Sequence, residues 1–249
     1  MTYNDYAAHF INTKFYMRLL LLCSTVLLNC YFAHAQTEKF DTYDNTTGRA
    51  NSAIYNGPIY INPFRFDQNT HQYFEEDVFK NGTVVYENQP YSVAELKYDV
   101  YQNKLILQSI GDYNNIAIDL ITDKISSFTL GNKNFVKLDT IGSTNAVKNQ
   151  FYEKIVVNPS KLIYVRHHKS RKEIFKGDLV VDRFASANDY FLFADEKLMN
   201  INSKKDAISA YPQFKRSIND FASTNRNLSK SNRSAFMENL LRFIATLNN

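Results

Sequence analysis

Residues 83–139 contain one short alternating segment of apolar and polar residues after another, with only two to four residues between neighbouring segments. The centres of these connections are residues 88–89, 102–103, 114–115, 122–123 and 132–133, and most of them contain asparagine. Asparagine suits turn positions, and connections this short cannot hold crossover helices. Consecutive strands must therefore be antiparallel neighbours, and the pattern predicts a β-meander.

One of these strands, residues 93–101, has two chemically different faces. Alternate positions place Ala94, Leu96, Tyr98 and Val100 on one face and Glu95, Lys97 and Asp99 on the other. The shared face makes Glu95 and Asp99 an alternative catalytic carboxylate pair, but Lys97 lies between them. We interpret the charged row as a solvated face whose residues form cross-strand partners.

Strand patterns continue on both sides of the meander. Residues 53–64 predict an edge or irregular strand, because Pro58 and Pro63 cannot donate to a sheet ladder. The less regular residues 66–82 predict a loop or one short helix. Further strands are expected at residues 151–157, 161–168 and 172–177, with a hairpin at residues 190–201 that turns at Asp195-Glu196.

Beyond residue 202 the apolar period changes from that of a strand to that of a helix. Short helices are expected at residues 203–211 and 213–224, and a longer one at residues 231–247. Ser203 is a suitable N-cap, and Asp206 stands where an acidic side chain can reach back toward the helix start.

The longest helix repeats apolar residues every three or four positions. They are Phe236, Leu240, Ile244 and Leu247. We interpret this stripe as core that docks on the sheet, with a membrane-surface or partner-binding face as the alternative. The sequence therefore predicts an α+β fold, mainly β: an antiparallel β-meander, as a curved sheet or a partly open barrel, with two to three C-terminal helices packed on it.

The N-terminal region has the layout of a secretory signal peptide over residues 1–35. An apolar run at residues 19–28 is followed by Ala33-His34-Ala35, which predicts cleavage between Ala35 and Gln36. The run is too short to span a bilayer, which takes about 20 apolar residues. A hydrophobic helix packed on the domain is the alternative, and Met17 is an alternative start of translation. We expect export to the periplasm or the outside of the cell, and no transmembrane segment after cleavage.

The only two cysteines, Cys23 and Cys30, lie within this leader. The mature chain therefore has no thiol and no disulfide, and its core alone must stabilise it. A lipid-modified cysteine would follow a small residue, but Leu22 and Asn29 precede these two. This argues against a lipoprotein.

The mature chain divides into three parts by pattern. Residues 36–52 are polar and predict a mobile N-terminal segment, residues 53–201 the meander, and residues 202–249 the helices. Because the helical stripe needs the sheet to cover it, we expect the last two parts to form one domain.

Charge is unevenly distributed along the mature chain. Residues 36–130 hold 7 Lys and Arg against 13 Asp and Glu, a net charge of −6, whereas residues 131–249 hold 20 against 11, a net charge of +9. The two parts could be solvated faces that attract each other, or the basic part could bind an anionic partner. Export argues against nucleic acid and favours acidic polysaccharide, lipopolysaccharide or phospholipid headgroups.

The densest basic stretch runs from residue 161 to 176. We take as candidate residues for an anionic partner Lys161, Tyr164, Arg166, Lys169, Arg171, Lys172 and Lys176. Cations interleaved with aromatic residues suit a sulfated, phosphorylated or uronic polymer. The alternative is a strand edge that carries lysine to prevent edge pairing.

His167 and His168 lie inside this stretch, but they do not predict a metal site. Adjacent residues of a strand point to opposite faces, and the neighbouring cations would repel a metal ion. The remaining mature histidine, His71, adds no second ligand. The acidic run of residues 75–77 could contribute to a calcium site, but such a site takes oxygens from several segments, so we interpret it as a solvated turn. No cofactor is expected.

One modification site is a candidate. Residues 139–141, Asp-Thr-Ile, match a short acceptor pattern for bacterial O-glycosylation at Thr140, although three residues recur easily by chance.

Longer stretches resemble a known kind of protein. Residues 91–107, 161–165 and 197–221, with their LKYD and SKKD motifs, resemble a family of uncharacterised exported proteins of Gram-negative bacteria. The resemblance implies a β-meander followed by a lysine-rich helical tail, and a location in the cell envelope. It implies no activity, cofactor or catalytic residue.

Two classes of function agree with these patterns. The first is a non-enzymatic cell-envelope binding or interaction module for an anionic polymer, a lipid or an envelope protein. The second is a secreted hydrolase with a dispersed carboxylate site. Common catalytic signatures such as G-x-S-x-G and H-E-x-x-H are missing from the sequence.

Overall fold

The computed structural model describes the greater part of the chain. The described residues are 53–67, 70–109, 116–138 and 149–247, and all of them belong to one unit, residues 53–249. The expected signal peptide with its cleavage site between Ala35 and Gln36, the segment 36–52 and the candidate glycosylation site Thr140 lie outside the described residues.

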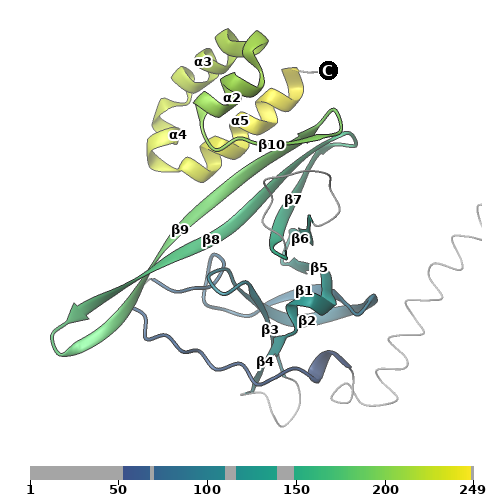
Figure 1. Ribbon diagram of the computed structural model, residues 1–249, viewed down its shortest axis with the longest axis vertical. Helices are drawn as coiled ribbons and strands as arrows, with labels where there is room; N and C mark the ends of the chain where they lie inside the picture. The colour runs from purple at the N-terminus through teal and green to yellow at the C-terminus, as the bar shows by residue number, and fades with distance from the viewer. Residues whose placement is uncertain (1–52, 68–69, 110–115, 139–148, 248–249) are drawn as a thin grey trace, which may run out of the picture. The chain divides into compact units, whose positions relative to one another are not determined.

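The strands form one ten-stranded sheet in which every neighbouring pair is antiparallel (Figure 1). They are β1 (Lys80–Tyr86), β2 (Gln89–Asp99), β3 (Lys104–Gln108), β4 (Ala117–Leu120), β5 (Ile125–Leu130), β6 (Lys133–Lys137), β7 (Phe151–Asn158), β8 (Lys161–Lys176), β9 (Leu179–Ala194) and β10 (Lys197–Asn200). Their order is β10-β9-β8-β7-β6-β5-β1-β2-β3-β4, and within the described residues its two edges do not pair, so the sheet is not closed. The predicted class, α+β and mainly β, is confirmed.

The sheet departs from a simple meander at β5, which pairs with β1 rather than with β4. Only residues 121–124 join β4 to β5, and they include a 3-10 turn, η4 (Thr122–Lys124). The five steps from Leu120 to Ile125 would span at most about 18 Å if fully extended, and the 3-10 turn shortens them further, whereas a flat sheet would place β4 about 19 Å from β5. The strands from β5 to β4 must therefore curl, so the prediction that these two strands are neighbours was wrong and the prediction of a curved sheet was right.

A glycine permits this curl at the junction of β1 and β5. A Cβ atom on Gly82 would lie 2.0 Å from the carbonyl oxygen of Thr129, so no other residue fits without a backbone shift. Between Gly82 and Val84 the pairing of β1 with β2 also shifts register. Such irregularities bend a strand and raise its local twist.

The inner face of the curled strands holds the first apolar core. Its fully covered members include Val84, Leu96, Leu105, Phe128 and Phe135. The predicted alternation of β2 is confirmed for this face, where Leu96, Tyr98 and Val100 are buried. Burial of such apolar surface contributes roughly 25 cal/mol for each Å² removed from water.

The hairpin of β8 and β9 is longer than the sequence indicated. Two strands separated by a basic turn were expected at residues 161–177, but β8 is one strand of 16 residues. Each residue from Leu162 to Lys176 pairs with β9, which provides continuous main-chain hydrogen bonding through the basic segment. The hairpin turns at Gly177, whose φ of 59° favours glycine.

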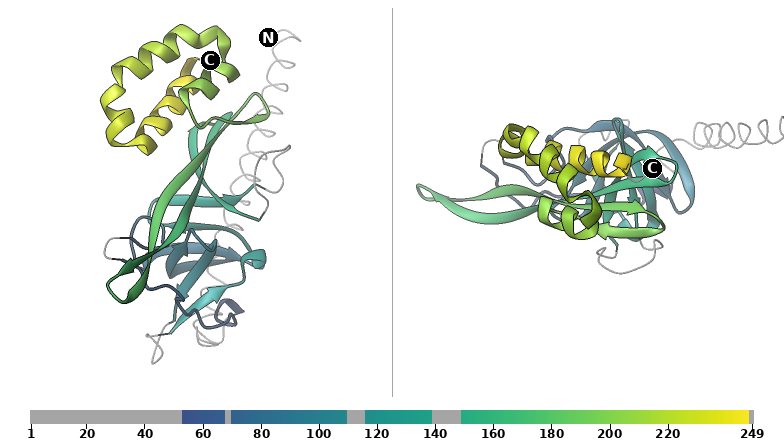
Figure 2. Two further views of the ribbon diagram at one scale, coloured as in Figure 1. Left: turned by 60° about the vertical axis from the view of Figure 1, so that its left-hand side comes forward. Right: turned by 90° about the horizontal axis from the view of Figure 1, so that it is seen from above.

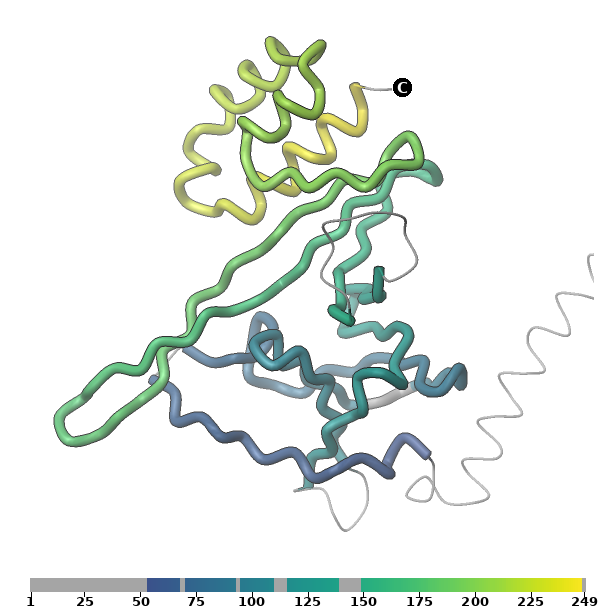
Figure 3. The backbone as a smooth tube through the Cα atoms, in the orientation of Figure 1, coloured from purple at the N-terminus to yellow at the C-terminus, as the bar shows by residue number. Residues whose placement is uncertain are grey.

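The two halves of this hairpin have different neighbours. The proximal half of β8, residues 161–165, pairs with both β7 and β9. Beyond it, residues 166–176 pair only with β9 among the described strands, and with residues 179–189 they form a two-stranded extension that we call the distal ribbon (Figure 3).

An irregular segment, which we call the strap, connects β4, the distal ribbon and β2. It comprises the described residues 58–67 and 70–74 and follows the short turn η2 (Ala53–Tyr55). Main-chain hydrogen bonds join Pro58 and Tyr60 to β4, and bridges join Phe66 to Asp182 and Tyr73 to Asp99. Both expectations for this region, an irregular edge segment and a loop, agree with its path.

Four α-helices follow the strands; the last of them packs directly on β8 and β9, and the other three contribute to the same apolar core (Figure 2). They are α2 (Lys204–Ala210), α3 (Lys215–Thr224), α4 (Arg226–Ser231) and α5 (Arg233–Leu247), with a 3-10 turn η5 (Pro212–Phe214) before α3. Three of them match the predicted helices, and α4 was not predicted. Ser203 caps α2 as expected by accepting from the Asp206 N–H, while the Asp206 carboxylate accepts from the N–H of Asn202.

The apolar stripe of α5 is core, as predicted. Phe236, Leu240 and Ile244 are buried against Ile163 and Leu192 of the hairpin. The opposite face of the proximal hairpin covers a smaller core that includes Tyr152, Tyr164 and Phe191. No helix within the described residues is long and apolar enough to cross a membrane.

Candidate functional site

Two residues of the predicted basic site are structural. Lys161 is buried, and its ammonium donates to the carbonyl oxygen of Ala245 at 2.8 Å, at the C-terminal end of α5. This position also complements the helix dipole. Tyr164 is buried in the small core on the other face. Neither side chain is available to an anionic partner.

Most of the remaining cations of β8 already have acceptors. Arg166 pairs with Asp189, Arg171 with Asp182 and Glu173, and Lys176 with Asp67. Lys169 donates to the carbonyl oxygen of His71 at 2.6 Å. Lys172 is exposed, and no ion pair joins it to another described residue. The structure therefore distributes the predicted residues over both faces of the ribbon and does not gather them into one surface.

His167 and His168 point to different partners, as the strand geometry predicted. His167 contacts Glu153 through Nε2 at 2.7 Å and Asn188 through Nδ1 at 3.1 Å. His168 lies 3.4 Å from Asp189. Within the described part of the chain, no group of three or more His, Cys, Asp or Glu side chains is placed to hold a metal ion.

The acidic run of residues 75–77 is neutralised by lysines. Glu75 and Glu76 both pair with Lys80, and Asp77 pairs with Lys97 at 2.8 Å. The solvated-turn interpretation agrees with this arrangement.

A different basic surface lies on the helices. Its members are exposed and come from all four helices: Lys204, Lys205, Lys215, Arg216, Arg226, Lys230, Arg233 and Arg242. No ion pair joins any of these eight side chains to a carboxylate among the described residues. We call this set the helical cations.

Few acidic groups balance the helical cations. Residues 202–249 contain eight Lys and Arg against three Asp and Glu, a net charge of +5. Asp206 is engaged in the cap of α2 and Glu238 is half buried, which leaves Asp220 as the exposed carboxylate. Arg226 and Lys230 stand four residues apart on one helix, where like charges repel.

The sequence signalled this surface only through the net charge of its second half. The helical cations are spread over nearly forty residues, from 204 to 242, so no short window is as basic as residues 161–176. Their common exposure becomes visible only when the four helices are folded.

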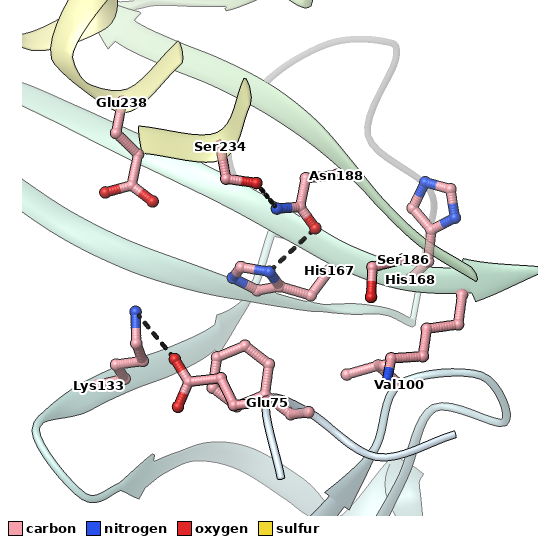
Figure 4. A pocket seen from close by; sticks show the side chains of 11 residues that line it. Glu75, Val100, Lys133, His167, His168, Ser186, Asn188, Ser234 and Glu238 are labelled. Atoms are coloured by element: carbon pink, nitrogen blue, oxygen red, sulfur yellow. Dashed lines mark hydrogen bonds and ion pairs between the residues drawn. The ribbon is translucent and has the colours of Figure 1, made fainter. Parts of the chain in front are cut away.

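The structure also contains a cavity of about 260 Å³ between the hairpin and α5 (Figure 4). Its walls come from β8 and β9, from α5, from Lys133 of β6, and from Phe74, Glu75 and Val100. Both signs of charge line it. The sequence drew attention to Glu75, His167, His168 and Lys169 one by one, but it gave no sign that they share a cavity with the remaining polar residues, Lys133, Ser186, Asn188, Ser234 and Glu238.

A chain of side-chain contacts fixes one wall of the cavity. Asn188 donates to Ser234 at 3.0 Å and contacts His167, which contacts Glu153, which in turn accepts from Lys133 at 2.7 Å. Both ring nitrogens of His167 are engaged, so this imidazole has no free nitrogen to serve as a catalytic base.

Two carboxyl groups near this wall have pKa values displaced in opposite directions. Burial would raise the pKa of Glu153, but hydrogen bonds from His167 and Lys133 outweigh it and hold the pKa below its usual value. Burial raises the pKa of Glu238, and the charge of Glu153 adds to this effect. Glu238 makes no side-chain hydrogen bond with any described residue.

Asp99, which the alternation of β2 placed on a solvated face, is completely buried. The strap covers it, and its carboxylate accepts from the N–H groups of Tyr101 and Gln102 and from the hydroxyl of Tyr60. Burial raises the pKa of Asp99 to about 6. Glu95 remains exposed, so the two do not form a carboxylate pair in a common site.

No protein-family model, curated protein or solved structure matches the chain.

Proposed function

We propose that the protein is a non-enzymatic binding module of the bacterial cell envelope, and that its helical cations hold an anionic polymer. The observation that carries this proposal is the group of eight exposed cations, none of which is paired with a carboxylate of the described residues. The excess of positive charge over residues 202–249 is unfavourable by itself, and an anionic partner offsets it while it gains Coulomb energy.

A polymer suits this surface better than a single anion. The cations are distributed over four helices instead of converging on one point, so a chain with repeated charges can contact several of them at once. Exposed hydroxyl and amide side chains lie among them, including Ser209, Ser223 and Asn227, and these can exchange hydrogen bonds with sugar hydroxyls.

The expected compartment narrows the class of polymer. The predicted signal peptide and the resemblance to exported Gram-negative proteins both support a place in the envelope, where acidic polysaccharide and lipopolysaccharide are the abundant polyanions. We therefore propose an acidic polysaccharide or the anionic core of lipopolysaccharide as the partner.

Retention on an immobilised uronic acid polymer tests the proposal. We expect the parent protein to be retained and to elute with salt, because exposed charges are screened within about 10 Å at 0.1 M ionic strength. Replacement of Lys215, Arg226 and Lys230 by serine should abolish most of the retention and flatten its salt dependence.

A control variant with the same net charge separates a specific surface from bulk charge. Arg65, Lys172 and Lys197 are exposed cations outside the helices, and their replacement by serine should leave retention nearly unchanged. Equal loss in both variants, or no retention of the parent protein, would refute the proposal.

A second candidate function, hydrolysis of such a polymer, is favoured by the two carboxyl groups beside the cavity. Carboxyl groups whose pKa values are displaced in opposite directions suit a general acid and its ionised partner. Incubation of the polymer with the parent protein and with the Glu238→Gln variant, followed by an assay of new reducing ends, decides between the two. Release by the parent protein alone would establish the hydrolase and displace the binding module.

A further inference from the structure

The cavity between the hairpin and α5 contains an acidic group that no protein side chain satisfies. Glu238 lies on α5 and points into the cavity, and its pKa is raised chiefly by burial (Figure 4). Lys133, His167 and Arg242 act on it through space, but none of them donates a hydrogen bond to it. A half-buried carboxyl without donors gains from a ligand that carries N–H groups.

The cavity also contains a basic group, Lys169, which lies on β8 in the distal ribbon. Lys169 lines the cavity and pairs across the strands with Ser186, two residue pairs beyond the pair of His167 with Asn188. Alternate residues of a strand are about 7 Å apart, so this end is well separated from the wall at α5. Figure 4 likewise shows Glu238 and Ser186 at different ends of the cavity.

Lys169 has capacity for a ligand. Its ammonium carries three N–H groups, and the carbonyl oxygen of His71 accepts one of them. Burial lowers the pKa of Lys169 to about 8, so at neutral pH the group stays mainly charged but is poorly hydrated. The side chain of Ser186 is exposed and offers a hydroxyl at the same end, which is open to solvent.

We propose that this cavity is a binding site for a small zwitterion of amino-acid size, with its cationic group on Glu238 and its anionic group on Lys169. The volume of about 260 Å³ lies just below the range of roughly 300–1,000 Å³ that is usual for drug-sized ligands. Phe74 and Val100 provide an apolar wall for the carbon chain between the two charges.

The site is built before the ligand arrives. The contacts from Ser234 through Asn188 and His167 to Glu153 hold the wall between the two charged ends in one arrangement. A fixed wall reduces the side-chain ordering that binding would otherwise cost.

A series of ω-amino acids measures the spacing that the site accepts. Isothermal titration of the full mature chain with glycine, β-alanine, 4-aminobutyrate and 5-aminopentanoate should show one member that binds best. Methylammonium and acetate, each with one charge, should bind at least tenfold more weakly than that member. The parent protein binding none of the series, or binding methylammonium equally well, would overturn the proposal.

One variant and a matched control test the contact with Glu238. Glu238→Gln keeps the shape of the side chain and should weaken the best ligand by about ten- to a hundredfold, as expected for the loss of a charge-assisted hydrogen bond. Glu95 is an exposed carboxyl that does not line the cavity, so Glu95→Gln is the matched control and should leave binding unchanged. Unchanged binding in Glu238→Gln would overturn the site.

The result is independent of the function proposed for the helical cations. The serine variant of Lys215, Arg226 and Lys230 changes no residue of the cavity and should bind the ω-amino acid as the parent protein does. Loss of zwitterion binding in that variant would place the ligand on the helical surface and refute the cavity site.

Discussion

The proximal and distal halves of the β8–β9 hairpin belong to the same two strands but are held in different ways. In the proximal half, Ile163, Val165 and Leu192 are completely covered, with helices on one face and the small aromatic core on the other. The distal ribbon has neighbours of another kind: the strap reaches it through polar contacts, among them those of Asp182, and through Phe64, which packs against Phe184.

The difference shows what each half depends on. Apolar burial is broad and additive, and it responds little to salt or pH. A few polar contacts around buried carboxylates are strong only while every partner is present, because a buried charge without its partner is costly. The proximal half should therefore carry the global stability, and the distal ribbon should open locally when one contact is lost.

The largest effect on stability is expected from a substitution that creates a cavity in the core of the proximal half. Leu240 of α5 is completely buried, and its replacement by alanine should lower the free energy of unfolding by about 2–5 kcal/mol. The same substitution at Leu179, which is exposed at the end of the distal ribbon, should change it by less than about 0.5 kcal/mol. Urea denaturation of both variants measures the contrast, and equal losses would refute it.

A pH-dependent effect of similar size is expected where the strap covers β2. The pKa of Asp99 is about 6 in the folded protein against 3.8 as its usual value, so folding favours the protonated acid. Its contribution to stability is complete below about pH 4 and is lost as the pH rises through 6, a difference of about 3 kcal/mol.

The Asp99→Asn variant isolates this contribution. Asparagine keeps the acceptor for the N–H groups of Tyr101 and Gln102 but does not ionise. We expect the unfolding free energy of the parent protein, relative to that of the variant, to fall between pH 4 and pH 6.5. A constant difference across this range would show that Asp99 titrates normally.

A smaller, local effect is expected at the contact between strap and ribbon. The buried carboxylate of Asp182 accepts from the N–H of Arg65 at 3.1 Å and from Arg171 at 2.7 Å. The Asp182→Asn substitution should lower the free energy of unfolding by about 1–3 kcal/mol, because it leaves Glu173 as the remaining carboxylate paired with the guanidinium of Arg171 among the described residues.

Hydrogen exchange locates that loss. Amides of the distal ribbon should exchange faster in Asp182→Asn, while those of residues 161–165 keep their protection. The exposed Asp178, changed to asparagine, is the control and should alter neither region. Faster exchange throughout the hairpin would mean that the two halves unfold together.

Local features of this fold were predictable from sequence, and distant ones were not. Alternation and turn residues predict that β2 pairs with β3 and that the chain turns at Asp195-Glu196 between β9 and β10. These features are predictable because the paired strands are only a few residues apart in the sequence. The pairing of β1 with β5 and the course of the strap depend on how far the sheet curls, which no short pattern encodes. The burial of Asp99 follows from the strap and was missed for the same reason.

The three candidate sites, which are the basic stretch 161–176, the helical cations and the cavity, also differ in how far the sequence could predict them. The density of lysine and arginine in the sequence pointed to residues 161–176. The acceptors of those cations, such as Asp67 and Asp189, lie elsewhere in the chain and are brought to them by folding. The helical cations were visible only as a net charge. The cavity combines Glu238 with Lys169, almost seventy residues apart, so its existence could not be predicted from either segment.

The smallest effect is expected at the tip of the distal ribbon, where Phe175 is 80% exposed. An aromatic side chain that contacts mostly water stabilises the fold little, so Phe175→Ser should change the free energy of unfolding by less than about 0.5 kcal/mol. Within the same ribbon, Phe184 is only 6% exposed and packs edge-on against Phe64 of the strap, so the strap and not the strand decides which aromatic is structural. Urea denaturation measures this change. A decrease of more than about 1 kcal/mol in the free energy of unfolding for Phe175→Ser would show that the tip of the distal ribbon is packed, and that the distal ribbon also depends on apolar burial.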